Sequence, residues 1–199
     1  MTEIVIRPLE EHELGEAAGV AARALVDAPT TVAAYGDDLF DRLALPYTDF
    51  RTLFTALPSP QVAAFCGRCV VGVAAVTPPG GCVGSFFGRA AADVLEKPTP
   101  GLGDPSRVHV FWAHFATHDP AEEHWHVGPV GVEPGFQGRG IGVSVVRELC
   151  STLDRQARVG WLETDKERNV RFYLSLGFTV VDTVTILGVP TWFMRREPG

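Results

Sequence analysis

The spacing of apolar and polar residues divides the first part of the chain into short strands and helices. In chain order, the pattern predicts a strand over residues 3–7, a helix over 10–26, helical patches over 32–45 and 48–56, a β-hairpin over 61–76 and mostly helix over 83–118. Pro8 is expected to end the first strand, and Pro46 to separate the two helical patches. A turn is expected at Pro58 and Pro60, and a loop over residues 97–105 interrupts the last helical stretch.

The last third of the chain has the clearest pattern. It predicts a strand over Trp125–Val132, a helix in which apolar residues recur from Ile141 to Leu153, a strand over Trp161–Glu163, a further helix, and strands over 178–187 and 190–196. Thr164 and Glu167 have the spacing of a capping box at the start of that further helix, which would carry Val170, Tyr173 and Leu174 on one face. Gly177 stands where a left-handed helix cap is expected. This order of elements predicts a mixed α/β fold, in one domain over residues 1–199.

Composition narrows the choice of partners. Apolar residues make up 46% of the chain, enough for a substantial core, and the formal net charge is −7. An acidic balance disfavours a nucleic-acid partner and is compatible with a cationic substrate. The sequence has neither an apolar run of about 20 residues nor a basic segment followed by an apolar one at its start. We therefore expect a cytoplasmic protein without a membrane partner, acting as a monomer or homodimer.

Cysteine and histidine spacings raise the question of a metal site. Cys66 and Cys69 form a CxxC pair, but the chain has no second matched pair, and the two thiols are expected to face each other across the hairpin. Two further pairs, His114 with His118 and His124 with His126, have spacings that can bind zinc. Because no HExxH motif or comparable acidic partner accompanies them, we expect no metal site.

A glycine-rich turn between a predicted strand and helix is the strongest chemical signal. Gly138, Gly140 and Gly142 let the backbone approach a ligand without a Cβ in the way. The helix that starts there offers unpaired N–H groups and the positive end of its dipole, and Arg139 adds a positive charge. The segment matches neither the dinucleotide GxGxxG pattern nor a Walker loop. It predicts a site for a diphosphate, the alternative being glycines that serve only a tight turn.

These residues resemble the acyl-CoA motif of the GNAT acetyltransferase superfamily, Gln/Arg-x-x-Gly-x-Gly/Ala, through Gln137, Gly140 and Gly142. Val130-Gly131-Val132 is similar to the family strand that separates from its neighbour, and Asn169 with the segment 172–178 is similar to the family's last motif. Within the family, the branch that contains puromycin N-acetyltransferase is the most similar, through His124-Trp125, the order of the motifs and Thr191-Trp192.

The resemblance implies the GNAT fold, a mostly antiparallel twisted sheet that opens at the cofactor site and is flanked by helices. It also implies acetyl-CoA as the acyl donor. Its binding residues would be Val130, Gly131, Val132, Gln137, Gly138, Arg139, Gly140, Ile141, Gly142, Val143 and Asn169. In this set, the strand backbone would bind the pantetheine and the turn would bind the diphosphate.

Acetyl transfer needs a neutral amine, a stabilised oxyanion and a proton for the leaving thiolate. A bulge in the pantetheine strand would free an N–H, such as that of Val130, for the thioester oxygen. Tyr173 is expected to protonate the thiolate, and His126 to accept the proton of the amine, directly or through water. Glu163 is expected to act as polar support and is the next candidate for the base, whereas His124 is expected to be a solvated surface residue.

The resulting prediction is an acetyl-CoA-dependent N-acetyltransferase that acts on a small-molecule amine, for instance an aminonucleoside or antibiotic-like amine. Two alternatives stay open at this point. The first is a protein or peptide N-acetyltransferase, which would need an open groove. The second is a non-catalytic acyl-CoA-binding sensor domain, because a fold alone does not determine function.

Overall fold

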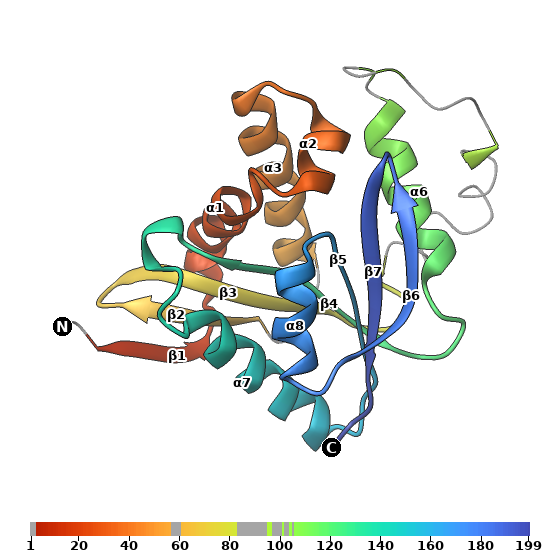
Figure 1. Cartoon of the computed structure of the whole chain (residues 1–199). Helices are drawn as coiled ribbons and strands as arrows, with labels where there is room; N and C mark the ends of the chain where they lie inside the picture. The colour runs from red at the N-terminus through yellow and green to blue at the C-terminus, as the bar shows by residue number, and fades with distance from the viewer. Residues whose placement is uncertain (1–2, 57–60, 83–94, 97–100, 102–103, 105) are drawn as a thin grey trace.

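The computed structural model describes residues 3–56, 61–82, 95–96, 101, 104 and 106–199. In this part of the chain, seven strands form one sheet in the order β1-β2-β3-β4-β5-β7-β6 (Figure 1). The strands are β1 (Ile4–Pro8), β2 (Val62–Cys66), β3 (Cys69–Thr77), β4 (Trp125–Val132), β5 (Gly160–Thr164), β6 (Thr179–Ile186) and β7 (Val189–Arg196). All neighbouring pairs are antiparallel except β4 and β5, which are parallel. The predicted mixed, mostly antiparallel sheet is confirmed.

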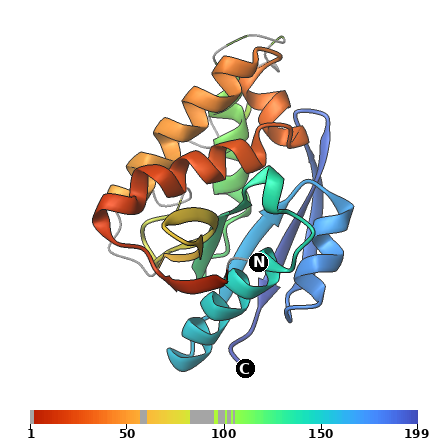
Figure 2. The same ribbon diagram turned by 90° about the vertical axis from the view of Figure 1, so that its left-hand side faces the viewer.

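Helices cover both faces of this sheet (Figure 2). One face carries α1 (Leu14–Leu25), α2 (Pro29–Tyr35), α3 (Leu39–Ala56) and α6 (Ser106–His118), and the other carries α7 (Ile141–Arg155) and α8 (Glu167–Leu174). Two short 3₁₀ turns, Glu11–Glu13 and Pro134–Phe136, precede α1 and α7. None of the helices in the described part of the chain combines the length and apolar character needed to cross a bilayer.

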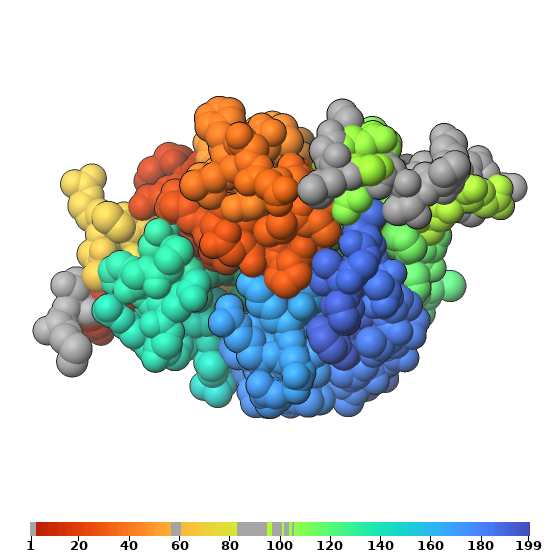
Figure 3. Space-filling model, turned by 45° about the horizontal axis from the view of Figure 1, so that its top comes forward, coloured from red at the N-terminus to blue at the C-terminus, as the bar shows by residue number. Residues whose placement is uncertain are grey.

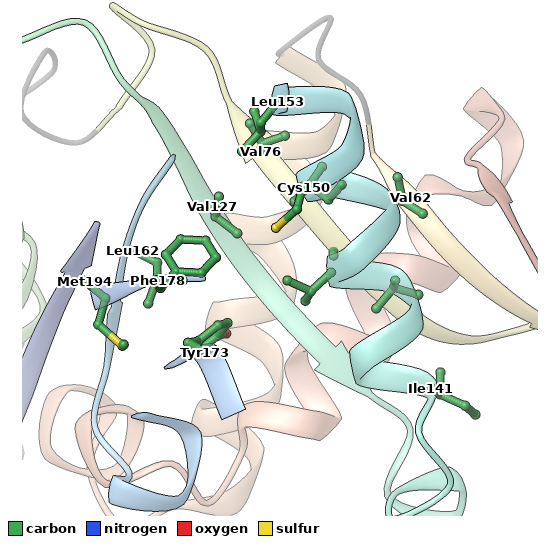
Figure 4. Packing of buried hydrophobic residues seen from close by; sticks show 14 of the residues in the cluster. Val62, Val76, Val127, Ile141, Cys150, Leu153, Leu162, Tyr173, Phe178 and Met194 are labelled. Carbon is green, nitrogen blue, oxygen red and sulfur yellow. The ribbon is translucent and has the colours of Figure 1, made fainter. Parts of the chain in front are cut away.

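The amphipathic pattern of α7 explains its position on the sheet. Val145, Val146, Leu149 and Leu153 lie on one side of the helix and are fully buried against β2, β3 and β4, as Figure 4 shows for Leu153. The helix begins close to the sheet because β3 has a glycine at the contact. A Cβ on Gly72 would lie 2.8 Å from Cγ2 of Ile141. The sequence therefore fixes where the glycine-rich turn before α7 lies relative to the strands.

A second close approach places α1 against β4. The buried face of α1 consists of small residues, chiefly alanine, which let the helix backbone come near the sheet. Gly131 in β4 completes this contact, because a Cβ there would lie 3.1 Å from Cα of Ala21 and 3.0 Å from Cβ of Ala24. Arg23 at the end of α1 also forms an ion pair with Glu133, at 2.8 Å. Together these contacts hold α1 over the end of β4.

Several local predictions are wrong, each for a physical reason. Pro46 lies inside α3 and is buried, and the break between helices falls instead at Gly36, whose positive φ of 89° ends α2. Asp38 then caps α3 by accepting a hydrogen bond from the N–H of Phe40 at 2.7 Å. The predicted helix over residues 83–94, the turn at Pro58 and Pro60, and most of the loop 97–105 lie outside the described residues.

The start and face of α8 also differ from the prediction. Thr164 is the last residue of β5 rather than a helix cap, and Lys166 occupies the N-cap position without a capping side-chain hydrogen bond. Val170 and Tyr173 are buried as predicted, but Leu174 is 49% exposed. Gly177 has a φ of 88°, which confirms the predicted left-handed cap.

Candidate active site

The sheet opens between β4 and β5. These two parallel strands pair only at Trp125 with Gly160 and at His126 with Trp161, although β4 continues to Val132 and β5 to Thr164. On its other side, β4 contains a bulge against β3. Val130 lies opposite Ala74 and Val127 opposite Val76, so three steps along β4 correspond to two along β3. The bulge predicted for the pantetheine strand therefore lies where β4 and β5 begin to diverge.

The glycine-rich turn leads from the free end of β4 into α7. Gly138 and Gly140 have φ values of 74° and 78°, which only glycine adopts at low cost. A Cβ on either residue would meet nothing within 4 Å, so the outer side of the turn is open. The first intrahelical bond runs from the N–H of Ser144 to Gly140 at 3.1 Å, which leaves the N–H groups of the preceding residues to other acceptors. The turn can accept an anion.

Side chains of the turn hold it in place. Gln137 donates a hydrogen bond to the carbonyl of Val132 at 3.0 Å. Arg139 donates to the carbonyl of Gly135 at 3.1 Å and lies 5.1 Å from the ring centre of Phe136. Figure 3 shows this turn, in teal, beside α8, in light blue, below the orange segment that holds α2 and α3. Gln137 and Arg139 are exposed, as cofactor-binding residues on such a turn require.

The other predicted cofactor residues lie along the same edge of the opening. Val130 and Val132 are half-buried in β4, and the side chain of Ile141 is buried in the core, so Ile141 can offer only its backbone N–H. Val143 is half-buried in the first turn of α7. The amide of Asn169 donates to Oγ1 of Thr164 at 3.1 Å, which ties α8 to the end of β5.

Tyr173 projects from α8 into the core beside the opening. It lies next to Phe178, Leu162 and β4, and its ring centre is 4.8 Å from that of Phe172 and 5.7 Å from that of Phe178 (Figure 4). Burial, together with the nearby charge of Glu163, raises the pKa of Tyr173 well above its ordinary value. The phenol therefore keeps its proton at neutral pH and can donate it.

His126 is the last residue of β4 that pairs with β5, and it is buried. Its Nε2 lies 2.8 Å from Oε2 of Glu163 on β5, and its Nδ1 lies 3.4 Å from Oδ1 of Asp119. Burial alone lowers the pKa of His126, but the two carboxylates outweigh it and raise this pKa well above its ordinary value. The His126–Glu163 contact thus bridges β4 and β5 at the point where their backbone pairing ends.

Sequence reasoning missed several residues around this point. His124 is buried rather than solvated, with 5% of its surface exposed. Asp119, directly after α6, reaches His126 without any local motif to mark it. Asp165, after β5, accepts hydrogen bonds from the backbone N–H and the hydroxyl of Thr30 in α2, at 2.8 and 2.7 Å. This contact joins residues 135 positions apart, so a local pattern cannot reveal it.

Comparison with known proteins agrees with this geometry. A model of the acetyltransferase (GNAT) family matches residues 33–178, more than half of the chain. The chain belongs to this family. The predicted family is therefore confirmed, and acetyl-CoA is the acyl donor in this family.

The individual relatives share only part of the chain or little sequence identity with it. The N-alpha-acetyltransferase RimI of Mycobacterium tuberculosis is 35% identical over 81 residues, which cover 38% of this chain. The chain spans about half the length of this curated relative, 50%. A histone acetyltransferase HPA2 and related acetyltransferase from Corynebacterium glutamicum has a TM-score of 0.69 at 16% identity, covering 98% of this chain and 97% of that one. A GNAT acetyltransferase from Brucella melitensis, solved in complex with acetyl-CoA, has a TM-score of 0.56 at 16% identity, covering 100% and 90%.

Proposed function

We propose that this GNAT acetyltransferase transfers the acetyl group of acetyl-CoA to the amine of a small molecule. The observation that carries the proposal is the opening between β4 and β5, which has a β4 bulge at its root and the glycine-rich turn at its outer end. The turn would bind the diphosphate through the N–H groups of residues 138–143, and Val130 and Val132 would pair with the pantetheine. The thioester would then lie at the root of the opening, with Asn169 near the cofactor.

The acceptor would bind on the opposite face of the sheet from α7 and α8. There α2 packs against α6 and β7, and the Thr30–Asp165 hydrogen bonds hold α2 beside the start of α8. A face covered by helices in this way favours a compact acceptor over an extended peptide. The acidic net charge of −7 and the similarity of His124-Trp125 and Thr191-Trp192 to the puromycin N-acetyltransferase branch support a small basic amine.

In the proposed reaction, the amine nitrogen forms a bond to the acetyl carbon and the bond from that carbon to the cofactor sulfur breaks. Tyr173 gives its proton to the departing thiolate, and a backbone N–H at the β4 bulge, such as that of Val130, stabilises the oxyanion. We assign the proton of the amine to the His126–Glu163 pair, through water where needed. Because the raised pKa of His126 means that its imidazole already holds a proton near neutral pH, Glu163 would accept the proton of the amine, with His126 as its hydrogen-bond donor. The 2.8 Å contact between these two side chains at the root of the opening supports treating them as one unit.

One observation favours a second candidate function. The 35% identity to RimI, an N-alpha-acetyltransferase, makes the terminal amine of a protein the alternative acceptor. The two candidates differ in what must fit over the sheet, because a protein N-terminus needs a groove that continues away from the thioester.

A thiol-release assay with acetyl-CoA distinguishes the candidates. The panel should pair small basic amines with peptides that begin in different residues, and a reaction without acceptor corrects for hydrolysis. We expect turnover with small amines and little with peptides. Steady turnover of peptides, with no small amine accepted, contradicts the proposal and supports the second candidate. Thiol release that does not rise above the acceptor-free rate with any amine contradicts both.

A further inference from the structure

A compact group of metal-ligand side chains lies beside the proposed active site. Cys82 lies beyond the end of β3, Asp119 follows α6, and His124 directly precedes β4. One ligand atom from each of the three residues lies within 4.8 Å of the other two. All three side chains are largely shielded from solvent, with 7% of Cys82 and 5% of His124 exposed, and 6% of the Asp119 side chain. Three distant segments therefore bring a thiol, a carboxylate and an imidazole to one buried point.

The orientation of His124 decides what kind of site this is. Its Nδ1 lies 2.9 Å from the carbonyl of Glu122, so Nδ1 carries the hydrogen and donates it there. In the neutral imidazole the lone pair is then on Nε2, which faces Oδ1 of Asp119 at 3.9 Å and lies close to the Cys82 thiol. A nucleophilic cysteine triad would instead place the carboxylate at the ring nitrogen that the thiol does not use. A metal-binding histidine, in contrast, commonly donates its other N–H to a backbone carbonyl, as His124 does.

We propose that Cys82, Asp119 and His124 bind a divalent cation of the zinc type. Thiolate, imidazole and carboxylate are the ligands that zinc prefers, whereas magnesium and calcium prefer oxygen alone. Zinc ligands lie about 2.0–2.3 Å from the ion, so neighbouring ligand atoms are roughly 3.5 Å apart. The present separations of up to 4.8 Å need to close by about 1 Å, which side-chain rotation supplies. The charges of a thiolate and a carboxylate balance that of the ion.

The site has an open side. The three ligands line a surface hollow of about 490 Å³ together with Pro79, Gly80, Glu122 and other residues. Three protein ligands leave a fourth position for water or a small ligand from this hollow, the arrangement of exchangeable rather than closed zinc sites. Of the two histidine pairs whose spacings can bind zinc, His114 with His118 is arranged differently. Nδ1 of His118 is 2.7 Å from the carbonyl of His114, and its ring stacks on Phe193.

The competing arrangement is a metal-free network in which Asp119 is shared by His124 and His126, at 3.9 and 3.4 Å. Titration of the chelator-treated 199-residue protein with cobalt(II) distinguishes the two arrangements. Cobalt bound to a thiolate gives a charge-transfer absorption that a metal-free network lacks. We expect this absorption at one equivalent of cobalt, its loss when zinc is added, and a rise in melting temperature with zinc.

Variants then locate the site. Cys82→Ser should abolish the thiolate band and weaken zinc binding by at least about 100-fold, since even second-shell changes cost about 10–100-fold. The matched control is the double variant Cys66→Ser with Cys69→Ser. It should keep the thiolate band and the zinc affinity, because these two cysteines lie opposite each other in the β2–β3 hairpin and are not part of the proposed site. His124→Gln is the second variant, in case Cys82→Ser does not fold, and should remove zinc binding while leaving the protein chain otherwise intact by circular dichroism.

Three results overturn the proposal. The first is a wild-type protein that shows no thiolate–cobalt band after chelator treatment, a measurement that needs no variant to fold. The second is a band that disappears in the hairpin double variant instead of in Cys82→Ser. The third is unchanged zinc affinity in a folded Cys82→Ser or His124→Gln protein.

Discussion

Replacing Tyr173 with phenylalanine removes a single oxygen atom from the proposed active site. The ring contacts with Phe172 and Phe178, at 4.8 and 5.7 Å, do not depend on that atom, so the packing of α8 should survive. We expect the free energy of unfolding to change by less than about 1 kcal/mol. Because burial and Glu163 raise the pKa of Tyr173, the wild-type phenol holds the proton that the thiolate needs.

The loss of a positioned acid typically reduces the rate by about 10²–10⁴. This corresponds to about 2.7–5.4 kcal/mol of activation free energy. We therefore expect kcat of Tyr173→Phe to fall by that factor, with little change in the affinity for acetyl-CoA. For the wild-type enzyme, the raised pKa also predicts that kcat does not fall through ionisation of Tyr173 below pH about 10, the ordinary value.

Steady-state thiol release with an amine that the wild type acetylates measures both quantities. Tyr47→Phe is the matched control, because Tyr47 lies on α3 and is 39% exposed, and this variant should keep full kcat. A Tyr173→Phe protein with undiminished kcat refutes the assignment of Tyr173 as the acid. If Tyr173→Phe loses activity together with several kcal/mol of stability, the hydroxyl also supports packing, which contradicts the expectation that it acts only in the reaction.

Three further changes test the cofactor site and the fold. Gly140→Asp places a negative charge at the turn proposed to bind the diphosphate, and should weaken acetyl-CoA binding by about 10–100-fold in calorimetry. Gly131→Ala forces a Cβ to within 3.1 Å of the α1 backbone, and should cost about 1–3 kcal/mol of stability in denaturant unfolding. Glu13, hydrogen-bonded to Arg7 at 2.8 Å, has its pKa lowered from 4.5 to about 2. The stability it contributes is present above pH 4.5 and is lost as the pH falls towards 2, so Glu13→Gln should cost about 1–2 kcal/mol at pH 7 and little at pH 2.

Each of these substitutions has a control that makes the same chemical change where the proposed effect is not expected. Gly67→Asp imposes a charge at another positive-φ glycine, in the β2–β3 hairpin, and should leave acetyl-CoA affinity unchanged. Equal weakening by both aspartates argues against the turn as the binding site. Gly135→Ala, where a Cβ meets nothing within 4 Å, should be neutral, and a Gly131→Ala protein of equal stability contradicts the close-packing argument. Glu11→Gln, at an exposed carboxylate, should not alter how stability depends on pH. If the stability of Glu13→Gln depends on pH as that of the wild type does, the Arg7–Glu13 pair is not the source of this dependence.

Sequence predicts the half of the site that is built locally. The strand Trp125–Val132 has the predicted bounds, and the turn and α7 follow it without interruption. Alternating apolar residues, glycines at positive φ and a helical repeat are signals carried by neighbouring residues, so a short stretch of sequence contains them. The helix break predicted at Pro46 is wrong because contacts with a distant segment override a local signal. Packing of α3 against α1 keeps the helix continuous through a residue whose local preference is to end it.

The surroundings of His126 depend on contacts between distant segments, which no local sequence pattern reveals. His126 was identified as a candidate from its place on β4, but its partners Asp119 and Glu163 come from the end of α6 and from β5. Buried polar groups need such partners, which the sequence does not specify. The same reasoning explains why His124 was expected at the surface. In the structure its ring lies close to Cys82, Asp119 and Trp161, which come from other segments of the chain.

The proposed cofactor surface is built locally, whereas the proposed acceptor surface is assembled from distant elements, and this contrast bears on acceptor preference. The surface proposed for the cofactor comes from one continuous segment, residues 130–143, together with α8, and any variation there would alter acetyl-CoA binding first. The surface proposed for the acceptor is assembled from α2, α6 and β7, which the Thr30–Asp165 contact ties to the β5–α8 connection. Acceptor preference can therefore change through α2 and α6 while the cofactor half stays the same. Substitutions that exchange acceptors should accordingly map to these helices, and those that abolish all transfer to the β4–α7 turn and Tyr173.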